Sequence, residues 1–384
     1  MSRDLILVAV ALFTWGIGEG MFFIFQPIYL QQWGASPVLI GVVVGAMGAA
    51  MAIAQIPAGY LADRLGGRAL MRVAWVIGLA ATLMMGFASS LAIFITGMLA
   101  YGLTAFVTAP LNSYIASARG KWSIERAISF GSAMFQMGAI SGPILGGILG
   151  QNFGLKAVYL IAAAIFVISC VAMFLVHPQL TESHHETDSK AKLYRNGPFI
   201  TFLVLSFLTV FATYLPQPLT PNFLQNQKYL SLETIGRLGS LASLGSVIFS
   251  FTLGNLNGAS GFLVGQLAVG LFTLILWRGN SITWISLGYL LLGGYRLMRN
   301  MGLAYSRSLI HTAETGLAFG VVETVNAIAI ILAPTLAGFL YNSNPLSIYT
   351  VSLTLIAVIF LVNLGLLTPS ANILHKLRAL FKLE

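Results

Sequence analysis

The chain has 384 residues, of which 57% are hydrophobic and only 8% are charged, and its formal net charge is +9. A soluble domain carries about 25% charged residues, so the composition excludes a water-soluble globule and indicates a membrane protein. We expect the basic excess to reflect membrane topology, and we do not expect a nucleic-acid partner.

Twelve apolar segments follow one another along the chain, each near the roughly 20 residues that cross a hydrocarbon core of about 30 Å. All are predicted to be helices, because an unpaired strand edge is not tolerated in lipid. The first six cover residues 5–31, 37–62, 69–88, 91–114, 126–149 and 156–176. The second six cover 198–224, 232–256, 261–277, 281–305, 315–341 and 345–367. The sequence therefore predicts an all-α membrane protein with twelve transmembrane helices.

Polar stretches divide this series into domains. We expect a six-helix bundle over 1–176, a cytoplasmic linker over 177–197, a second six-helix bundle over 198–368 and a basic amphipathic tail over 369–384 that lies on the inner membrane surface. The linker contains His184, His185 and Glu186. We interpret this cluster as part of a flexible charged linker and predict no metal site, since no second group of ligands faces it.

The positions of the basic residues predict the orientation of the chain. Of the 20 Lys and Arg residues, 14 fall on one side of the predicted spans, four fall on the other, and Arg296 and Arg299 fall within a span. Basic residues accumulate on the cytoplasmic side of membrane proteins. The sequence therefore predicts a multi-pass protein of the cell membrane, in a bacterium the inner membrane, with both termini in the cytoplasm.

The two sets of six segments are internal repeats. "FQPIYLQQ" at 25–32 recurs as "LTPNFLQN" at 219–226, so that Pro27 corresponds to Pro221. The offset between matched residues stays near constant along the chain, for example 191 between Gly102 and Gly293. Two copies of an even-numbered unit enter the membrane from the same side, and an axis along the membrane normal can relate them.

Two motifs stand out within the first repeat. The loop after the second predicted span reads G-Y-L-A-D-R-L-G-G-R and includes Gly59, Asp63, Arg64, Gly67 and Arg68. The fifth predicted span carries Gly138, Gly142, Pro143, Gly146 and Gly147. The loop resembles the signature G-x-L-a-D-r-x-G-r of the major facilitator superfamily, and the glycine and proline pattern is similar to the motif of its drug/proton antiporters.

The resemblance covers the whole chain and implies the fold of that superfamily, two pseudo-symmetric six-helix bundles around a central cavity. It implies a monomeric membrane transporter rather than an enzyme, surrounded by lipid, which moves a small-molecule substrate and uses a proton gradient with no bound cofactor or metal. It also implies that the loop latches the two halves together on the cytoplasmic side in one conformation. Residues 97–114 contain no basic residue, unlike the corresponding helix of the drug/proton antiporters.

The glycine stripe of the fifth span has two interpretations. Gly138, Gly142 and Gly146 are spaced four residues apart, so they lie on one helix face where a second helix can approach closely. Dense packing alone explains this spacing. Alternatively, the face lies at the seam between the two halves and limits leakage while the halves move.

Four charged residues fall inside apolar spans, namely Glu19, Arg296, Arg299 and Glu323. Each costs at least about 2.5–3.5 kcal/mol at the bilayer centre. The residues that correspond to them in the other repeat are uncharged: in the same order, Thr213, Ala105, Thr108 and Met134. Because the scaffold does not require them, we interpret the four charges as parts of a functional site.

Arg296 and Glu323 are predicted to lie at similar depths, which differ by roughly 3 Å at a helical rise of 1.5 Å per residue. They could therefore form an ion pair between two neighbouring helices. Such a pair either fixes the helices in place or marks a transport pathway, since a buried ion pair is weak evidence for stability alone.

These features predict a secondary active transporter that moves small organic molecules across the cytoplasmic membrane by alternating access, as a proton-coupled efflux system (antiport). Glu19 or Glu323 would carry the coupling proton, and Arg296 or Arg299 would bind anionic groups of the substrate or release the carboxylate. Two alternatives stay open: proton-coupled uptake of an organic anion, and a sensor on the same scaffold that transports nothing. We do not expect an enzyme, because no nucleophile, base or metal constellation falls at bilayer depth.

Overall fold

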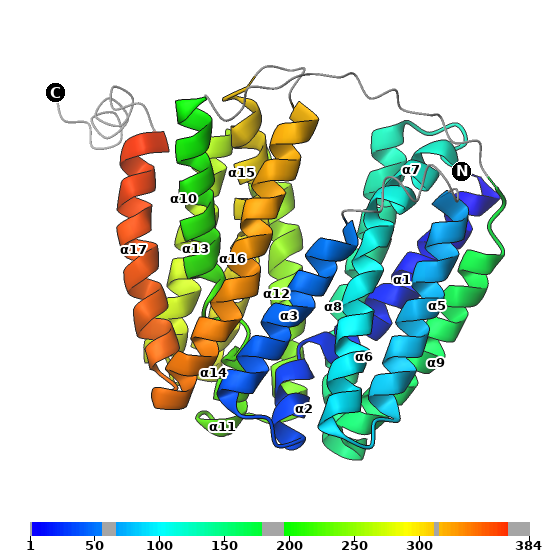
Figure 1. Ribbon diagram of the computed structural model, residues 1–384, viewed down its shortest axis with the longest axis horizontal. Helices are drawn as coiled ribbons and strands as arrows, with labels where there is room; N and C mark the ends of the chain where they lie inside the picture. Colours follow the sequence, from blue (N-terminus) through cyan, green and yellow to red (C-terminus); the bar gives the residue numbers. More distant parts are fainter. Residues whose placement is uncertain (1, 56–66, 179–195, 311–314, 368–384) are drawn as a thin grey trace. The chain divides into compact units, whose positions relative to one another are not determined.

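The computed structural model describes residues 2–55, 67–178, 196–310 and 315–367. All regular elements among them are helices (Figure 1). The first repeat contains α1 (Arg3–Phe23), α2 (Gln26–Gln32), α3 (Pro37–Gln55), α5 (Gly67–Gly86), α6 (Leu91–Leu103), the short 3-10 helix η1 (Thr104–Val107), α7 (Thr108–Ser117), α8 (Ile124–Phe153) and α9 (Leu155–Phe174). The second contains α10 (Gly197–Tyr214), α11 (Thr220–Asn226), α12 (Leu232–Leu253), α13 (Gly258–Arg278), α14 (Ile282–Leu292), α15 (Gly294–Arg307), α16 (Thr315–Ser343) and α17 (Ser347–Leu367).

Within the described ranges, eleven segments are helical, apolar and long enough to cross a membrane, and they match eleven of the predicted spans. The remaining span, predicted at 281–305, is formed by α14 and α15 together. The chain breaks there at Gly293, whose α-carbon lies against the backbone of Gly245 and Ser246 on α12, so that a side chain at this position would overlap it. The twelve-helix prediction is confirmed, and the span at 281–305 is divided at Gly293.

Both repeats interrupt the same helices. The first helix of each repeat ends and resumes as a short helix that begins with a proline in its first turn, Pro27 in α2 and Pro221 in α11. Proline is tolerated there because the first helical N–H groups have no intrahelical acceptor. The fourth helix of each repeat is interrupted just after Gly102 and at Gly293. The irregular backbone therefore follows the repeat that the sequence predicts.

The described residues form two compact units. Unit 1 contains residues 1–187, 218–243 and 334–342, and unit 2 contains 188–217, 244–333 and 343–384. Segments 218–243 and 334–342 belong to the second repeat by sequence, yet they pack with the first repeat. The compact units therefore cut across the bundles predicted at 1–176 and 198–368. Residues 179–195 of the predicted 177–197 linker and the whole predicted tail at 369–384 lie outside the described residues.

In unit 1, α1 packs against both α8 and α9, and α5 packs against α6 and α9 (Figure 1). Aromatic rings fill the centre of this group of helices. Trp15 of α1 stacks on Phe166 of α9 with ring centroids 4.3 Å apart, and Phe22 stacks on Tyr159 at 5.1 Å. Ser169 joins three helices, because its hydroxyl accepts from Trp75 Nε1 at 2.7 Å and donates to the carbonyl of Ala11 at 2.6 Å.

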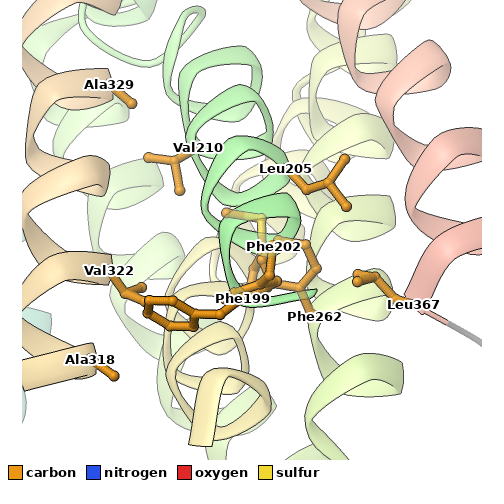
Figure 2. Close-up of a cluster of buried hydrophobic side chains, with 10 residues drawn as sticks. Phe199, Phe202, Leu205, Val210, Phe262, Ala318, Val322, Ala329 and Leu367 are labelled. Atoms are coloured by element: carbon orange, nitrogen blue, oxygen red, sulfur yellow. The ribbon is translucent and has the colours of Figure 1, made fainter. Parts of the chain in front are cut away.

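The core of unit 2 is an apolar cluster between α10, α13, α15, α16 and α17 (Figure 2). Phe202 contributes the largest ring contacts, to Phe262 at 5.9 Å and Tyr305 at 5.1 Å. Polar bonds also join the buried helices, such as that from the Ser206 hydroxyl of α10 to Asn326 Oδ1 of α16 at 2.8 Å. These contacts hold α15 and α16, which carry three of the four predicted site charges, at defined positions on α10.

Candidate functional site

Glu19 lies on α1 near the middle of the combined α1 and α2 segment. Its carboxylate accepts a hydrogen bond from Trp15 Nε1 at 3.0 Å and another from the Tyr101 hydroxyl at 2.8 Å. Trp15 is one turn away on the same helix, and Tyr101 comes from α6. The rings of both donors are buried, with 8% and 4% of their surface exposed, whereas Glu19 is half-buried. Two neutral donors thus hold the half-buried acid.

Glycines on both sides of Glu19 allow other helices to pack closely around it. Gly18 and Gly20 flank Glu19, and a side chain at Gly18 would overlap the ring of Phe166. Gly20 faces Gly142 and Pro143 of α8. Because neither sequence neighbour of Glu19 has a side chain, Phe166 and α8 can pack close beside it.

In unit 2, Arg299 of α15 forms an ion pair with Glu323 of α16. The side chains are 27% and 43% exposed, so the pair is open to its surroundings. Arg299 lies eight residues before the end of α15, and Glu323 lies eight residues after the start of α16. At equal helical rise the two therefore reach the same depth.

The sequence analysis considered a pair between Arg296 and Glu323, and the structure shows that Arg299, one turn further along α15, forms an ion pair with Glu323. Because α15 continues to Arg307, two residues beyond the predicted end at 305, the level of Glu323 moves by about 3 Å along the helix, toward Arg299. Arg296 is exposed on the neighbouring turn.

Two tyrosines complete the surroundings of the pair. Tyr295 lies one turn before Arg299 on α15, and its ring lies 5.9 Å from that of Tyr214 at the end of α10. The Tyr295 hydroxyl oxygen lies beside the guanidinium of Arg299 and can accept from it, but among the described residues neither the hydroxyl proton of Tyr295 nor Arg299 Nε has an acceptor. We call Tyr214, Tyr295, Arg299 and Glu323 the unit 2 corner.

The exposed face of α15 is polar although the helix belongs to a membrane span. Arg296, Asn300 and Arg307 are exposed and lie on one side of the helix, while Gly294, Met298 and Gly302 are buried on the other. The buried side packs on α13, where Gly265 contacts the backbone of Gly294 and Met298. Since arginine in lipid is costly, the exposed face of α15 fits water rather than acyl chains.

The glycine stripe of α8 packs on α1. Side chains at Gly138, Gly142 and Gly146 would overlap the backbone of α1 at Phe13, Ile17 and Met21. The stripe therefore serves close packing inside the first repeat. Gly147 contacts a different helix, α12, which belongs to the second repeat, and Pro143 contacts both α12 and Gly20 of α1.

A seam between the repeats is present inside unit 1 and consists of two matched pairs of contacts. Gly236 of α12 lies against the carbonyl of Pro143, and Gly147 lies against the backbone of Glu233. At offsets of 195 and 191, the same contacts recur where Gly41 of α3 meets the carbonyl of Pro334 and Gly338 of α16 meets Val38. In each case backbone meets backbone with no side chain between.

An amide cluster lies beside this seam, where α2 meets α11. The Asn222 amide donates to Gln31 Oε1 at 2.6 Å and to the carbonyl of Pro27 at 3.0 Å. The Asn226 amide donates to the same Gln31 oxygen at 2.9 Å, and Gln31 Nε2 donates to Asn226 Oδ1 at 3.3 Å. The cluster joins the first repeat to the second at the end of α1 that is remote from Arg3.

The predicted gating loop falls largely outside the described residues. Gly59, Asp63 and Arg64 lie in the 56–66 gap. Gly67 begins α5, and Arg68 follows it in the first turn with a buried Nε that has no hydrogen-bond partner among the described residues. The part of the chain that the structure describes contains no group of three His, Cys, Asp or Glu side chains arranged to hold a metal ion.

The chain was compared with known protein families. Residues 8–258 match the family model described as Major Facilitator Superfamily. The chain belongs to this superfamily. It is therefore a membrane transporter, as the loop and helix motifs predicted.

Individual members of the superfamily share limited sequence identity with the chain. An uncharacterized MFS-type transporter of Methanocaldococcus jannaschii is 26% identical over 46% of each chain, so less than half of that relative is matched. The class E tetracycline resistance protein of Escherichia coli is 25% identical over 90% of this chain and 89% of its own. A crystal structure of a mutant nucleoside transporter NupG superposes with a TM-score of 0.85 at 14% identity, over 95% of this chain and 100% of NupG, which supports the superfamily fold.

Within this superfamily fold, sequence analysis missed some partners of the site residues. Trp15 was not predicted, although its spacing of four residues from Glu19 places both on one helix face. Tyr101, Tyr214 and Tyr295 were among many polar side chains in the spans, and nothing in their spacing separated them from tyrosines that only pack. Their roles depend on how α6, α10 and α15 are rotated, which periodicity does not determine.

Proposed function

We propose that the chain is a proton-coupled secondary transporter that exports small organic molecules across the cytoplasmic membrane by alternating access, with protons moving in the opposite direction. The observation that carries this proposal is the position of Glu19, an acid at mid-span held by the indole of Trp15 and the hydroxyl of Tyr101. The tyrosine hydroxyl donates to an ionised carboxylate and can accept from a protonated one. The cluster therefore tolerates both protonation states.

Exchange follows if a proton and a group of the substrate compete for this carboxylate. Occupation by one then excludes the other, and each cycle moves them in opposite directions. Export is further supported by the tetracycline resistance relative, which the chain matches over most of its length, and by the glycine and proline motif of α8. The bias of basic residues supports cytoplasmic termini, and we propose that the transporter works as a monomer.

A second candidate function is co-transport of an organic anion with a proton, and the Arg299 to Glu323 pair favours it. A proton on Glu323 would release Arg299, which could then hold an anionic group of the substrate. Proton and anion would bind together in that case and cross in the same direction.

The two candidates predict opposite proton movements. The purified protein is placed in liposomes that contain a pH-sensitive dye, and tetracycline or benzenesulfonate is added outside. Antiport of tetracycline makes the lumen alkaline, whereas co-transport of benzenesulfonate makes it acidic. Glu19→Gln is expected to abolish the first signal, and Glu125→Gln, at an exposed acid in the first turn of α8, should leave it intact. Equal signals from wild type, Glu19→Gln and empty liposomes would refute the export proposal.

A further inference from the structure

We infer that the unit 2 corner is a binding site for an anionic group, a carboxylate or sulfonate, of the transported molecule. The inference rests on the proposed function only in assuming that a small organic molecule is transported, and it holds for either direction of transport. The corner brings together Tyr214 from α10, Tyr295 and Arg299 from α15, and Glu323 from α16.

The first argument is that the corner contains hydrogen-bond donors without acceptors. Arg299 Nε and the Tyr295 hydroxyl are buried atoms with no hydrogen-bond partner among the described residues. They lie one turn apart on the same helix, beside each other. Buried donors are nearly always satisfied in folded proteins, so an acceptor outside the chain is expected here. One oxyanion has enough lone pairs to accept from both.

The second argument is the balance of charge. Glu323 is the one acidic side chain among the described residues of unit 2, which contain Arg278, Arg296, Arg299 and Arg307. Arg299 already holds a carboxylate, that of Glu323, which demonstrates that the corner accommodates such a group. The guanidinium presents several N–H donors in a fork that suits carboxylates and related anions. Glu323 thus acts as an internal occupant that a ligand can replace.

The third argument is that the fold does not need the corner. At the offset of 191, Tyr295 corresponds to Thr104 and Arg299 to Thr108 in the first repeat, and the residue that corresponds to Glu323 is Met134. The same helices are built there without a charge. Tyr214 and Tyr295 add two neighbouring rings at an interplanar angle of 32°, which suit an apolar body attached to the anionic group.

The test replaces the internal occupant. Glu323→Ala removes the carboxylate from Arg299 and is expected to lower the melting temperature of the purified protein in detergent. Sodium acetate should restore much of the loss, whereas sodium chloride at equal ionic strength and acetamide should not. Arg299→Gln combined with Glu323→Ala should abolish the acetate effect. Glu125→Ala is the matched control at an exposed acid, and acetate should have no specific effect on it.

A second measurement uses Glu323→Gln, which keeps a side chain of similar size, so that the test does not depend on the folding of Glu323→Ala. Binding of benzenesulfonate and of neutral benzenesulfonamide is measured by calorimetry to wild type and to Glu323→Gln. The sulfonate should bind about tenfold more tightly to Glu323→Gln, because a charge-assisted hydrogen bond no longer competes for Arg299. Tyr295→Phe should weaken the sulfonate about tenfold.

Two results overturn the inference: acetate no more effective than chloride on a folded Glu323→Ala, or sulfonate and sulfonamide binding with equal affinity. Neither measurement uses a gradient. An anion that binds without any coupled proton movement in liposomes would therefore refute the proposed function and leave the anion site standing. Proton movement without anion binding would refute the anion site and leave the proposed function standing.

Discussion

Under the proposed alternating access we expect the amide cluster of Gln31, Asn222 and Asn226 to open, and removal of Gln31 should make this easier. Gln31→Ala deletes three hydrogen bonds between α2 and α11. Each contributes about 0.5–1.5 kcal/mol net, and the exposure of Gln31 places the sum near the lower end, at about 1.5–2 kcal/mol. A change of that size raises the open population roughly 10- to 30-fold.

The opening can be measured at Ser240 of α12, which is 5% exposed and lies next to Gly239, the neighbour of Ile24 and Pro143. Ser240→Cys is introduced after the one native cysteine, Cys170, is changed to Ala. If opening limits the reaction, a membrane-impermeant maleimide should label this cysteine about 10- to 30-fold faster in the Gln31→Ala background. Gln32→Ala, at the exposed neighbour of Gln31, is the control and should leave the rate unchanged. Equal labelling rates in the two backgrounds would refute the reasoning.

The remaining predictions concern packing and the acid of α1. Gly146→Leu should destabilise the protein by about 3 kcal/mol or more, because the new side chain overlaps the backbone of α1. Gly365→Ala is the control: no atom lies within 4 Å of the new carbon, so the melting temperature should be unchanged or slightly raised. Ser169→Ala orphans the buried N–H of Trp75 and should cost about 1–3 kcal/mol in denaturant unfolding; a loss below 0.5 kcal/mol would contradict this. Tyr101→Phe removes the hydroxyl that donates to Glu19 and should slow the proposed proton-coupled transport about tenfold at unchanged expression, as followed by the dye assay.

The sequence predicted the helices and the repeat because both depend on local properties. Apolar segments of sufficient length must be helical in lipid, and matched residues such as Pro27 and Pro221 kept a constant offset. The break at Gly293 was not predicted. Glycine only weakens a helix, and the close approach of α12 that requires glycine there is a tertiary contact.

The site was predicted in part for the same reason. The cost of charge in a membrane identified Glu19, Arg299 and Glu323 as unusual, but the partner of Glu323 depended on where α15 ends, and the two donors to Glu19 depended on helix rotation. The glycine stripe of α8 is similar. Its spacing predicts a smooth helix face, but the tertiary structure alone shows that α1 is the helix that packs on this face.

The seam glycines of unit 1 have a mechanical consequence. At Gly41, Gly147, Gly236 and Gly338 the main chains of the two repeats meet directly. Backbone contacts of this kind can separate without a change of side-chain rotamer. Their separation therefore has a small energetic cost. Resistance to separation is then concentrated at their rim, where a few amides can set how often the transporter changes state.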